Sequence, residues 1–471
     1  MGHKDELPAR DKLPKTSSLR IHIFDHPAIT AFAGRYLRQG GFAHNVTILA
    51  GGTAIGQAVV VLSSPILTRL YSPSSFGILA VYVSLLSFLL GIASWRYHMA
   101  IPLAESNQSV ASLLVLCFAL LLGMALVLVL AIALRGAAIV AWTNTPALAP
   151  FLWLLPLSYL GAGAFQLLTA WAIRTNEFGK LARSKLGQSA GQALTQVAFG
   201  VVLSGPVGLL IGDAIGRTAG SMNLARQMWA QLRDDFRTVS AGSVLQIGIR
   251  YKRFPLISSV AGFISSAGDQ IPTLLIASLY GPTIVGWFGL VQRLLSMSFV
   301  LVASAIGTVF LSESARLAQQ DPQRLLNLFW KTATRASLIA SILFIGVVLT
   351  TPLLFGPLFG SQWSGAARFA QILAFPASLQ FVNRSVGSAA IIVERQDLDF
   401  AGECISTLSA SAAVILAKQM DASPMTCIVM LSVGLSVGCL SGLLLSWYAI
   451  HSVVRQQGGI EEKTAMEVQA Q

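Results

Sequence analysis

Long apolar stretches separated by short polar segments follow one another from residue 45 to residue 449. A helix crosses a bilayer with about 20 apolar residues, and windows of this length divide the chain into expected spans. The twelve spans are residues 45–70, 76–94, 109–134, 148–171, 187–203, 207–225, 256–279, 284–311, 336–350, 366–392, 401–417 and 425–449. The pattern predicts an all-α polytopic membrane protein.

Composition supports this fold class and excludes a water-soluble one. Of 471 residues, 54% are hydrophobic and 11% are charged, and the mean hydropathy is +0.68. Soluble chains contain about 25% charged residues, so fewer than half the usual surface charges are present. A soluble fold of this size cannot cover so much apolar surface.

The chain carries 32 Lys and Arg against 20 Asp and Glu, a net charge of +12. On the twelve-span map, 25 of the 32 cations fall on the side of the N-terminus, three on the opposite side and four within spans. This asymmetry predicts cytosolic termini by the positive-inside rule. We call the cation-rich side the basic side. Nucleic-acid binding is disfavoured because the cations are divided among short loops.

An internal repeat divides the spans into two halves. The pattern LYxPxxxG occurs at residues 70–77 and again at 279–286, an offset of 209 residues. Each copy joins the first two helices of a half, which predicts two six-helix lobes related by a pseudo-two-fold axis, with a V-shaped central cavity between them. The expected domains are a cytosolic tail 1–44, a first lobe 45–226, a cytosolic linker 227–255, a second lobe 256–449 and a cytosolic tail 450–471. The first tail lacks the apolar core of a cleavable signal peptide.

Three segments carry a family resemblance. They are residues 45–77, which include NVTILAGGTAIGQ and SPILTRLYSP, residues 268–294 with GDQ, YGP and QRL, and residues 394–398 with ERQDL. Together they resemble Wzx-type flippases of the polysaccharide exporter branch of the multidrug/oligosaccharidyl-lipid/polysaccharide exporter superfamily. The resemblance implies transport of an undecaprenyl-pyrophosphate-linked oligosaccharide (O-antigen, capsule or exopolysaccharide) to the outer leaflet of the bacterial inner (cytoplasmic) membrane. Two departures are a longer N-terminal tail and Gln270, where many relatives have Arg.

Ionised side chains within a membrane are costly, so each is a candidate functional residue. Asp269 and Arg293 lie ~15 Å and ~10 Å from the outer ends of the seventh and eighth spans at 1.5 Å per residue, so we expect them to meet. Arg293 would bind pyrophosphate, and Asp269 would couple transport to protons or sodium. The alternative is a structural pair that locks two helices. Arg384 and Asn383, which have no acidic neighbour in sequence, are expected to face a wet cavity and to bind the substrate there.

For the other candidate residues, the sequence supports a structural role as well as a role in transport. Arg217 follows Asp213 by four residues, so the two can form an ion pair on one helix face; otherwise Arg217 binds substrate and Asp213 takes part in ion coupling. Arg69 lies near the outer interface, where it can contact substrate or extend to the headgroups. Gln57 in the first span either contacts the glycan or packs against a helix.

No cofactor, metal or catalytic constellation is indicated. The chain has no Walker motif and no nucleophile triad, so we expect a transporter and not an enzyme. Its four cysteines lie in apolar runs without metal-binding or paired spacing: Cys117, Cys404, Cys427 and Cys439. The expected partners are a polyprenyl-pyrophosphate-linked oligosaccharide, membrane lipids and a polysaccharide polymerase.

Two alternative functions remain open. A drug or metabolite antiporter of the same superfamily would need intramembrane carboxylates, whereas four cations and two anions stand inside the spans. A membrane glycan polymerase or ligase would need a sizeable outer loop with catalytic groups. The longest outer loop, residues 351–365, has no ionisable residue.

Overall fold

The structure, a computed structural model, describes residues 42–203, 205–393 and 395–469. Residues 1–47 and residues 48–471 form two separate units, and each is considered by itself. The second unit is built from helices, with no strand among its described residues. The expected all-α fold is confirmed, while the expected tail up to residue 41 lies outside the described residues.

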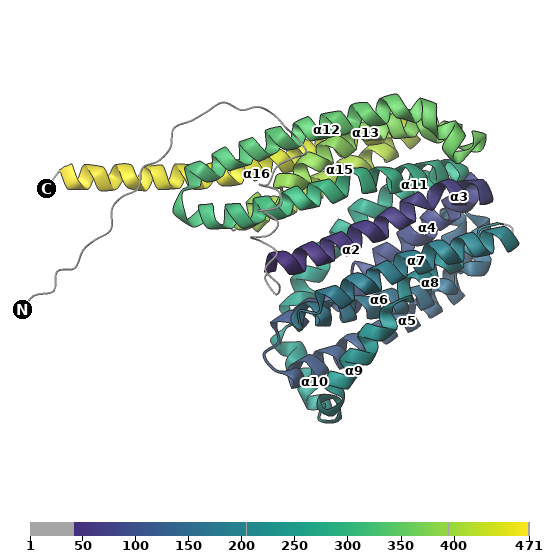
Figure 1. Cartoon of the computed structure of the whole chain (residues 1–471), viewed down its shortest axis with the longest axis horizontal. Coiled ribbons are helices and arrows are strands. Elements are labelled where there is room, and N and C mark those ends of the chain that lie inside the picture. The colour runs from purple at the N-terminus through teal and green to yellow at the C-terminus, as the bar shows by residue number, and fades with distance from the viewer. Residues whose placement is uncertain (1–41, 204, 394, 470–471) are drawn as a thin grey trace, which may run out of the picture. The chain divides into compact units, whose positions relative to one another are not determined.

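The first half of the chain forms lobe 1, which runs from purple to teal in Figure 1. Its α-helices are α2 (Phe42–Leu62), α3 (Ser64–Leu70), α4 (Pro73–Leu90), α5 (Asn107–Trp142), α6 (Leu154–Arg174), α7 (Phe178–Val202) and α8 (Val207–Thr218). Two short 3-10 helices connect them, η1 (Ala93–Leu103) before α5 and η2 (Pro146–Phe151) before α6. The first expected span is broken at Ser63, between α2 and α3.

The second half forms lobe 2, which runs from teal-green to yellow in Figure 1. Its α-helices are α11 (Ser259–Gln320), α12 (Pro322–Phe359), α13 (Ser364–Val386), α14 (Ala389–Ile392), α15 (Gln396–Gln419) and α16 (Pro424–Gln469). A π-helical turn, η3 (Phe254–Ser258), leads into α11, and a 3-10 turn, η4 (Ser361–Trp363), joins α12 to α13. The segment expected as the C-terminal tail continues α16 without a break.

The segment expected to link the lobes is largely helical. It contains most of α9 (Ser221–Arg237) and all of α10 (Ala241–Arg250). Ser240 caps α10, because its hydroxyl accepts a hydrogen bond from the Ser243 amide while the Ser243 hydroxyl accepts one from the Ser240 amide. The two helices lie at one edge of lobe 1 in Figure 1.

Several helices are long and apolar enough to cross a membrane. Within the described residues, these are seven stretches: Ile48–Leu70, Pro73–Leu90, Asn107–Trp142, Phe254–Ser296, Gln323–Phe359, Gln396–Gln419 and Pro424–Arg455. The stretch Phe254–Ser296 covers the seventh and part of the eighth expected span. The remaining expected spans coincide with α6, α7, α8 and α13, which are shorter or more polar. The chain is therefore a multi-pass membrane protein.

The seventh and eighth expected spans are the two arms of α11, which are separated by a kink with non-helical backbone. Its backbone turns at Gly281, where φ is +76°, a conformation that glycine adopts without strain. Pro282 follows and has no N–H to continue the preceding helix. This turn is the second copy of the LYxPxxxG repeat.

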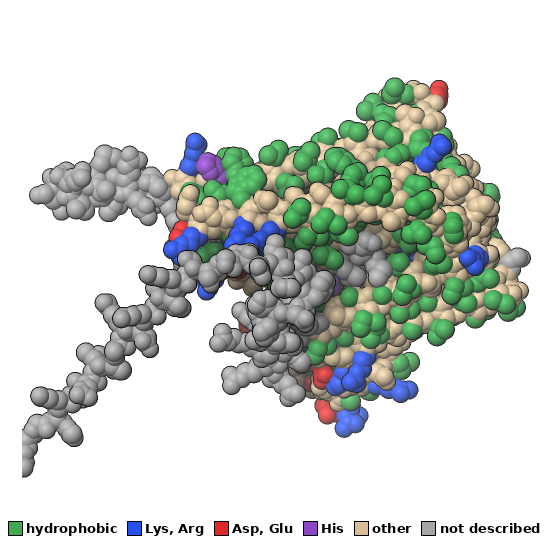
Figure 2. All heavy atoms as spheres, turned by 45° about the horizontal axis from the view of Figure 1, so that its top comes forward, with side chains coloured by type: hydrophobic (Ala, Val, Ile, Leu, Met, Phe, Trp, Pro, Cys, Tyr) green, Lys and Arg blue, Asp and Glu red, His purple; other side chains and the backbone are tan. Residues whose placement is uncertain are grey.

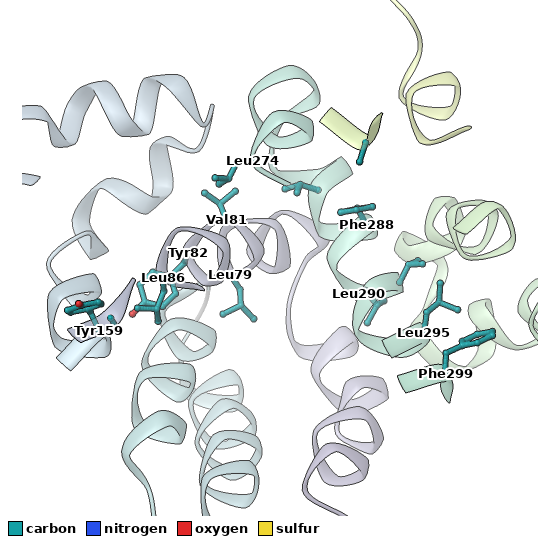
Figure 3. Close-up of a cluster of buried hydrophobic side chains, with 14 of the residues drawn as sticks. Leu79, Val81, Tyr82, Leu86, Tyr159, Leu274, Phe288, Leu290, Leu295 and Phe299 are labelled. Atoms are coloured by element: carbon teal, nitrogen blue, oxygen red, sulfur yellow. The ribbon is translucent and has the colours of Figure 1, made fainter. Parts of the chain in front are cut away.

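The two copies of the repeat touch each other where α4 packs against α11. A Cβ on Gly77 would overlap the Pro282 carbonyl oxygen, and a Cβ on Gly286 would overlap the Pro73 carbonyl oxygen. The contact is reciprocal, as a pseudo-two-fold axis between the copies requires. Apolar packing continues beside it, with Val81 of α4 next to Leu274 of α11 in the buried core (Figure 3).

Candidate functional site

A cavity of about 340 Å³ lies between the lobes, among α2, α4, α7, α8 and α11, and we call it the central cavity. Apolar and small side chains of α4 form one wall. The large polar side chains that line it are Gln192, Asp213, Gln270, Gln292 and Arg293. Such a cavity suits a ligand with a polar, hydrogen-bonding headgroup.

Arg293 of α11 projects toward lobe 1 in this cavity. Its Nη2 donates a hydrogen bond of 2.6 Å to the carbonyl oxygen of Val60, and its Nε is buried without a hydrogen-bond partner. Asp213 interacts with its charge, yet no carboxylate of a described residue lies within 4 Å of its guanidinium. Part of its hydrogen-bonding capacity is therefore free for a ligand.

The break between α2 and α3 makes the Val60 carbonyl available. This oxygen also accepts hydrogen bonds from the hydroxyls of Ser63, at 2.7 Å, and Ser64, at 3.3 Å. Pro65 stands at the start of α3, where a proline is tolerated because its missing N–H would have no partner. The contact of Val60 with Arg293 was not predicted from the sequence, although the run Ser63-Ser64-Pro65 is a signal for a break in the helix.

Asp213 and Arg217 form the ion pair that their four-residue spacing predicts. Nε of Arg217 lies 2.6 Å from Oδ2 of Asp213, and Nε2 of Gln192 donates to Oδ1 of Asp213 at 3.1 Å. Asp213 is buried, so its charge depends on these partners. The Gln192 hydrogen bond ties this pair to α7, and Arg293 has no ion pair of its own among the described residues.

A row of glutamines on α7, missed from the sequence, holds α8 in place. Gln188 donates to the carbonyl of Arg217 at 2.7 Å, and Gln196 donates to the carbonyl of Leu209 at 3.1 Å. With Gln192 between them, they repeat every four residues along one helix face. That spacing was the sequence signal for a polar helix contact inside the membrane.

A second cavity lies inside lobe 2, and we call it the lobe 2 cavity. It has two chambers, of about 290 and 570 Å³, that share Asp269 of α11 and Arg384 of α13. The charges of these two residues interact. Asn383 lines the larger chamber, and Gly442 leaves room for its amide. The smaller chamber and the central cavity have lining residues in common: Gln270, Gln292 and Ser296.

The structure changes two expectations about these charges. Asp269 is not brought to Arg293, since no ion pair within 4 Å joins them in the described part of the chain, and Asp269 instead interacts with Arg384. Arg384 faces a cavity, as expected, but it has an acidic neighbour. Sequence position gave the depth of each residue in its helix but not the direction in which its side chain points.

Two further carboxylates, missed from the sequence, line the larger chamber of the lobe 2 cavity. They are Asp399 and Glu403 at the start of α15, and Glu403 interacts with the charges of both Asp399 and Asp269. Three carboxylates thus face one guanidinium, Arg384, in this cavity. In the central cavity Asp213 is paired with Arg217, which leaves the charge of Arg293 in excess, whereas the lobe 2 cavity is acidic. The i, i+4 spacing of Asp399 and Glu403 was the available signal.

The other predicted residues lie outside both cavities. Arg69 is exposed, and its Nη2 donates to the carbonyl of Pro357 near the end of α12, at 3.1 Å, across the two lobes. Gln57 is exposed on α2 and lines neither cavity. Among the described residues, no group of three or more His, Cys, Asp or Glu side chains is placed to hold a metal ion.

Comparisons with known proteins agree with this architecture. The family model described as polysaccharide biosynthesis protein matches residues 66–368. No curated protein matches the chain significantly.

Solved structures share the fold. An inward-facing multidrug resistance transporter of the MATE family, in the MOP superfamily, has a TM-score of 0.66 and 13% identity, covering 85% of this chain and 96% of its own. The lipid II flippase MurJ in an inward closed conformation has a TM-score of 0.63 and 11% identity, with 84% and 86% covered. The MATE transporter VcmN of Vibrio cholerae has a TM-score of 0.58 and 14% identity, with 92% and 99% covered.

These fold neighbours are transporters and a flippase, not enzymes. The family match spans well over half of the chain, from α3 to the first turns of α13. The chain therefore belongs to the polysaccharide biosynthesis protein family, with the two-lobe helical fold of MOP superfamily transporters.

Proposed function

We propose that the protein is a flippase that moves a polyprenyl-pyrophosphate-linked oligosaccharide from the cytosolic to the outer leaflet of a bacterial inner membrane. The observation that carries the proposal is Arg293, a guanidinium in the central cavity with one hydrogen bond, to a backbone carbonyl. Membership of a polysaccharide biosynthesis family and the fold shared with a lipid II flippase support it. A polysaccharide polymerase would then use the translocated unit.

The chemistry of the central cavity suits a pyrophosphate headgroup. A guanidinium binds phosphate oxygens through two parallel hydrogen bonds, and such charge-assisted bonds are stronger than a bond to a neutral carbonyl. The headgroup would take over the bond to Val60, while Gln270 and Gln292 offer amides to sugar hydroxyls. The polyprenyl tail would stay in the lipid while the lobes rock about the headgroup.

The acidic lobe 2 cavity supports coupling of this transport to a cation gradient. Asp269 lines the smaller chamber, and this chamber has lining residues in common with the central cavity. Asp269 also interacts with Arg384. Binding of a proton or a sodium ion at Asp269 would weaken its attraction for Arg384. Arg384 would then be free to turn toward the substrate, with Asn383 beside it.

A second candidate function is export of a cationic drug or metabolite. The observation that favours it is the same acidic cavity, in which Asp269, Asp399 and Glu403 face one arginine. The two candidates differ in the need for Arg293. A cationic substrate gains nothing from this guanidinium, whereas a pyrophosphate depends on it.

The test is substitution of Arg293 in cells that depend on this chain for glycan export. We expect Arg293→Ala to lower the rate of flipping about tenfold or more, because hydrogen bonds to charged groups contribute about 1.5 to 3 kcal/mol. Arg293→Lys keeps the charge but not the paired geometry and should be intermediate. The measurement is the amount of lipid-linked oligosaccharide on each leaflet.

The matched control is Arg316→Ala, which removes an exposed arginine from the same helix. It should leave flipping and protein level unchanged. Normal flipping by a well-inserted Arg293→Ala protein would eliminate the cationic-cavity proposal. Loss of organic-cation export without accumulation of lipid-linked glycan, in cells that lack the whole chain, would favour the second candidate.

A further inference from the structure

The helices α9 and α10 carry a surface that the proposed transport cycle does not use. One face of α9 packs against lobe 1 through Leu224, Met228 and Leu232, which are buried and spaced by four residues. The exposed positions of α9 and α10 are rich in basic and large apolar side chains. In Figure 2, basic side chains gather at the edge of the molecule where these helices lie, with a few acidic ones among them.

The exposed side of α9 combines apolar and basic residues in one stripe. Met222 and Trp229 are each 62% exposed, and Arg226 and Arg233 are exposed between and after them. At 3.6 residues per turn, these four positions share one helix face. Trp229 also stacks on Phe236, with ring centroids 5.5 Å apart. Tryptophan and arginine on one face are typical of a helix that lies in the headgroup region of a membrane.

Beside this stripe, α5 and α10 enclose an apolar groove of about 710 Å³. Leu245 and Ile249 of α10 line it and are 65% and 57% exposed. Val115 of α5 faces them from the other wall. Val115 lies eight residues after Asn107, the first residue of α5. This wall of the groove therefore lies ~12 Å from the start of a membrane-spanning helix, toward the acyl-chain region.

The polar end of the groove carries an available cation. Lys252 lines the groove, is exposed and has no ion pair with a described residue. Arg250 nearby is held by Glu105 at 2.5 Å, so its charge is already compensated. A groove that is apolar along its length and basic at one end matches an acyl chain attached to an anionic headgroup.

We propose that the α9–α10 segment is a binding surface for an acidic phospholipid of the leaflet on the basic side. One acyl chain occupies the α5–α10 groove, the phosphate pairs with Lys252, and the stripe of α9 rests on neighbouring anionic headgroups. Charge complementarity selects this occupant, because the surface places Arg226, Arg233 and Lys252 around exposed apolar side chains. Arg233 lies 3.8 Å from Asp234, but both side chains are exposed, so this ion pair holds its charge only weakly. The inference does not depend on what the central cavity transports.

The test uses the purified full-length protein in neutral detergent, with phosphatidylglycerol or phosphatidylcholine added as the probe. Native mass spectrometry counts the lipids retained on the protein. We expect the wild-type chain to retain phosphatidylglycerol selectively. Combined Arg226→Gln, Arg233→Gln and Lys252→Gln should lower this selectivity by about two orders of magnitude, since each basic side chain near an anionic surface contributes about 1 kcal/mol. The matched control neutralises three other exposed cations, Arg316, Lys331 and Arg335.

A second variant tests the groove without changing charge. A Cβ on Gly248 would lie 3.5 Å from a Leu116 methyl, an ordinary contact, so Gly248→Leu fills the groove without backbone strain. It should reduce retention of phosphatidylglycerol while the protein keeps its monodisperse elution. Equal retention of the two lipids by the wild type, or equal loss in the control triple variant, would overturn the proposal. So would unchanged retention in Gly248→Leu.

Discussion

Asp269 and Arg293 stand on the same helix but serve different cavities. Asp269 precedes the bend of α11 at Gly281 and turns toward α13, whereas Arg293 follows the bend and turns toward α2. Hydropathy predicts how deep each residue lies, because depth follows from counting residues along a helix. It does not predict the rotation of the helix about its axis, and this rotation decides which charges meet.

At this scale, Asp269→Asn tests the coupling part of the proposed function. The change keeps the size of the side chain but removes its charge, so it can no longer respond to protons or attract sodium. We expect flipping to become independent of pH and of sodium, at a reduced rate. The measurement is transport into proteoliposomes under imposed gradients.

The control for this experiment is Asp421→Asn, in an exposed loop between α15 and α16. It should leave both dependences as in the wild type. Persistence of the wild-type pH and sodium profile in Asp269→Asn would remove Asp269 from the coupling step, while leaving the role of Arg293 untouched.

At the scale of elements, the sequence predicted more than at the scale of residues. The apolar windows coincide with helices because burial of a whole membrane span does not depend on which neighbour it meets. The LYxPxxxG repeat likewise predicted two halves with the same orientation, and its two copies meet at α4 and α11. The break at Ser63 was not predicted, because it depends on tertiary contacts of a Pro-containing turn, whereas the kink of α11 at Gly281 falls at the turn expected between the seventh and eighth spans.

The repeat contact leads to a prediction about stability. Gly77→Ala would place a methyl group against the Pro282 carbonyl, a backbone atom that cannot rotate away. We expect loss of about 1 to 3 kcal/mol, the usual cost of overpacking, despite the better helix propensity of alanine. Thermal unfolding in detergent, followed by loss of the monodisperse peak, measures the effect as a lowered Tm.

Gly123→Ala is the matched control for this change. Gly123 lies in α5, and a Cβ there would have no atom within 4 Å. Its Tm should equal or slightly exceed that of the wild type. If Gly77→Ala unfolds at the same temperature as Gly123→Ala, the close contact between the repeats is not part of the folded state.

At the scale of the whole molecule, the two lobes are joined at the end opposite the basic side. Trp363 and Gln362 of η4 donate to the carbonyl of Thr68, at 3.1 and 3.0 Å. The ring of Trp363 also meets Phe76 edge to face, with centroids 5.0 Å apart. Arg69, predicted as a substrate contact, adds its hydrogen bond to α12 at the same end. These contacts join the lobes on this side, so the proposed alternating access would require them to break.

Trp363→Phe removes one hydrogen bond of this closure and keeps an aromatic ring against Phe76. A lost hydrogen bond changes the equilibrium by about 1 kcal/mol, so the open population should rise about fivefold. The readout is a single cysteine at Ser296, which lines the central cavity, in a chain whose four native cysteines are replaced. An impermeant thiol reagent added from the opposite side should label it faster in Trp363→Phe. Trp142→Phe, at an exposed tryptophan at the end of α5, should not change the rate. Equal rates in both variants would mean that closure does not depend on Trp363, and the repeat contact between α4 and α11 would then be the barrier to test.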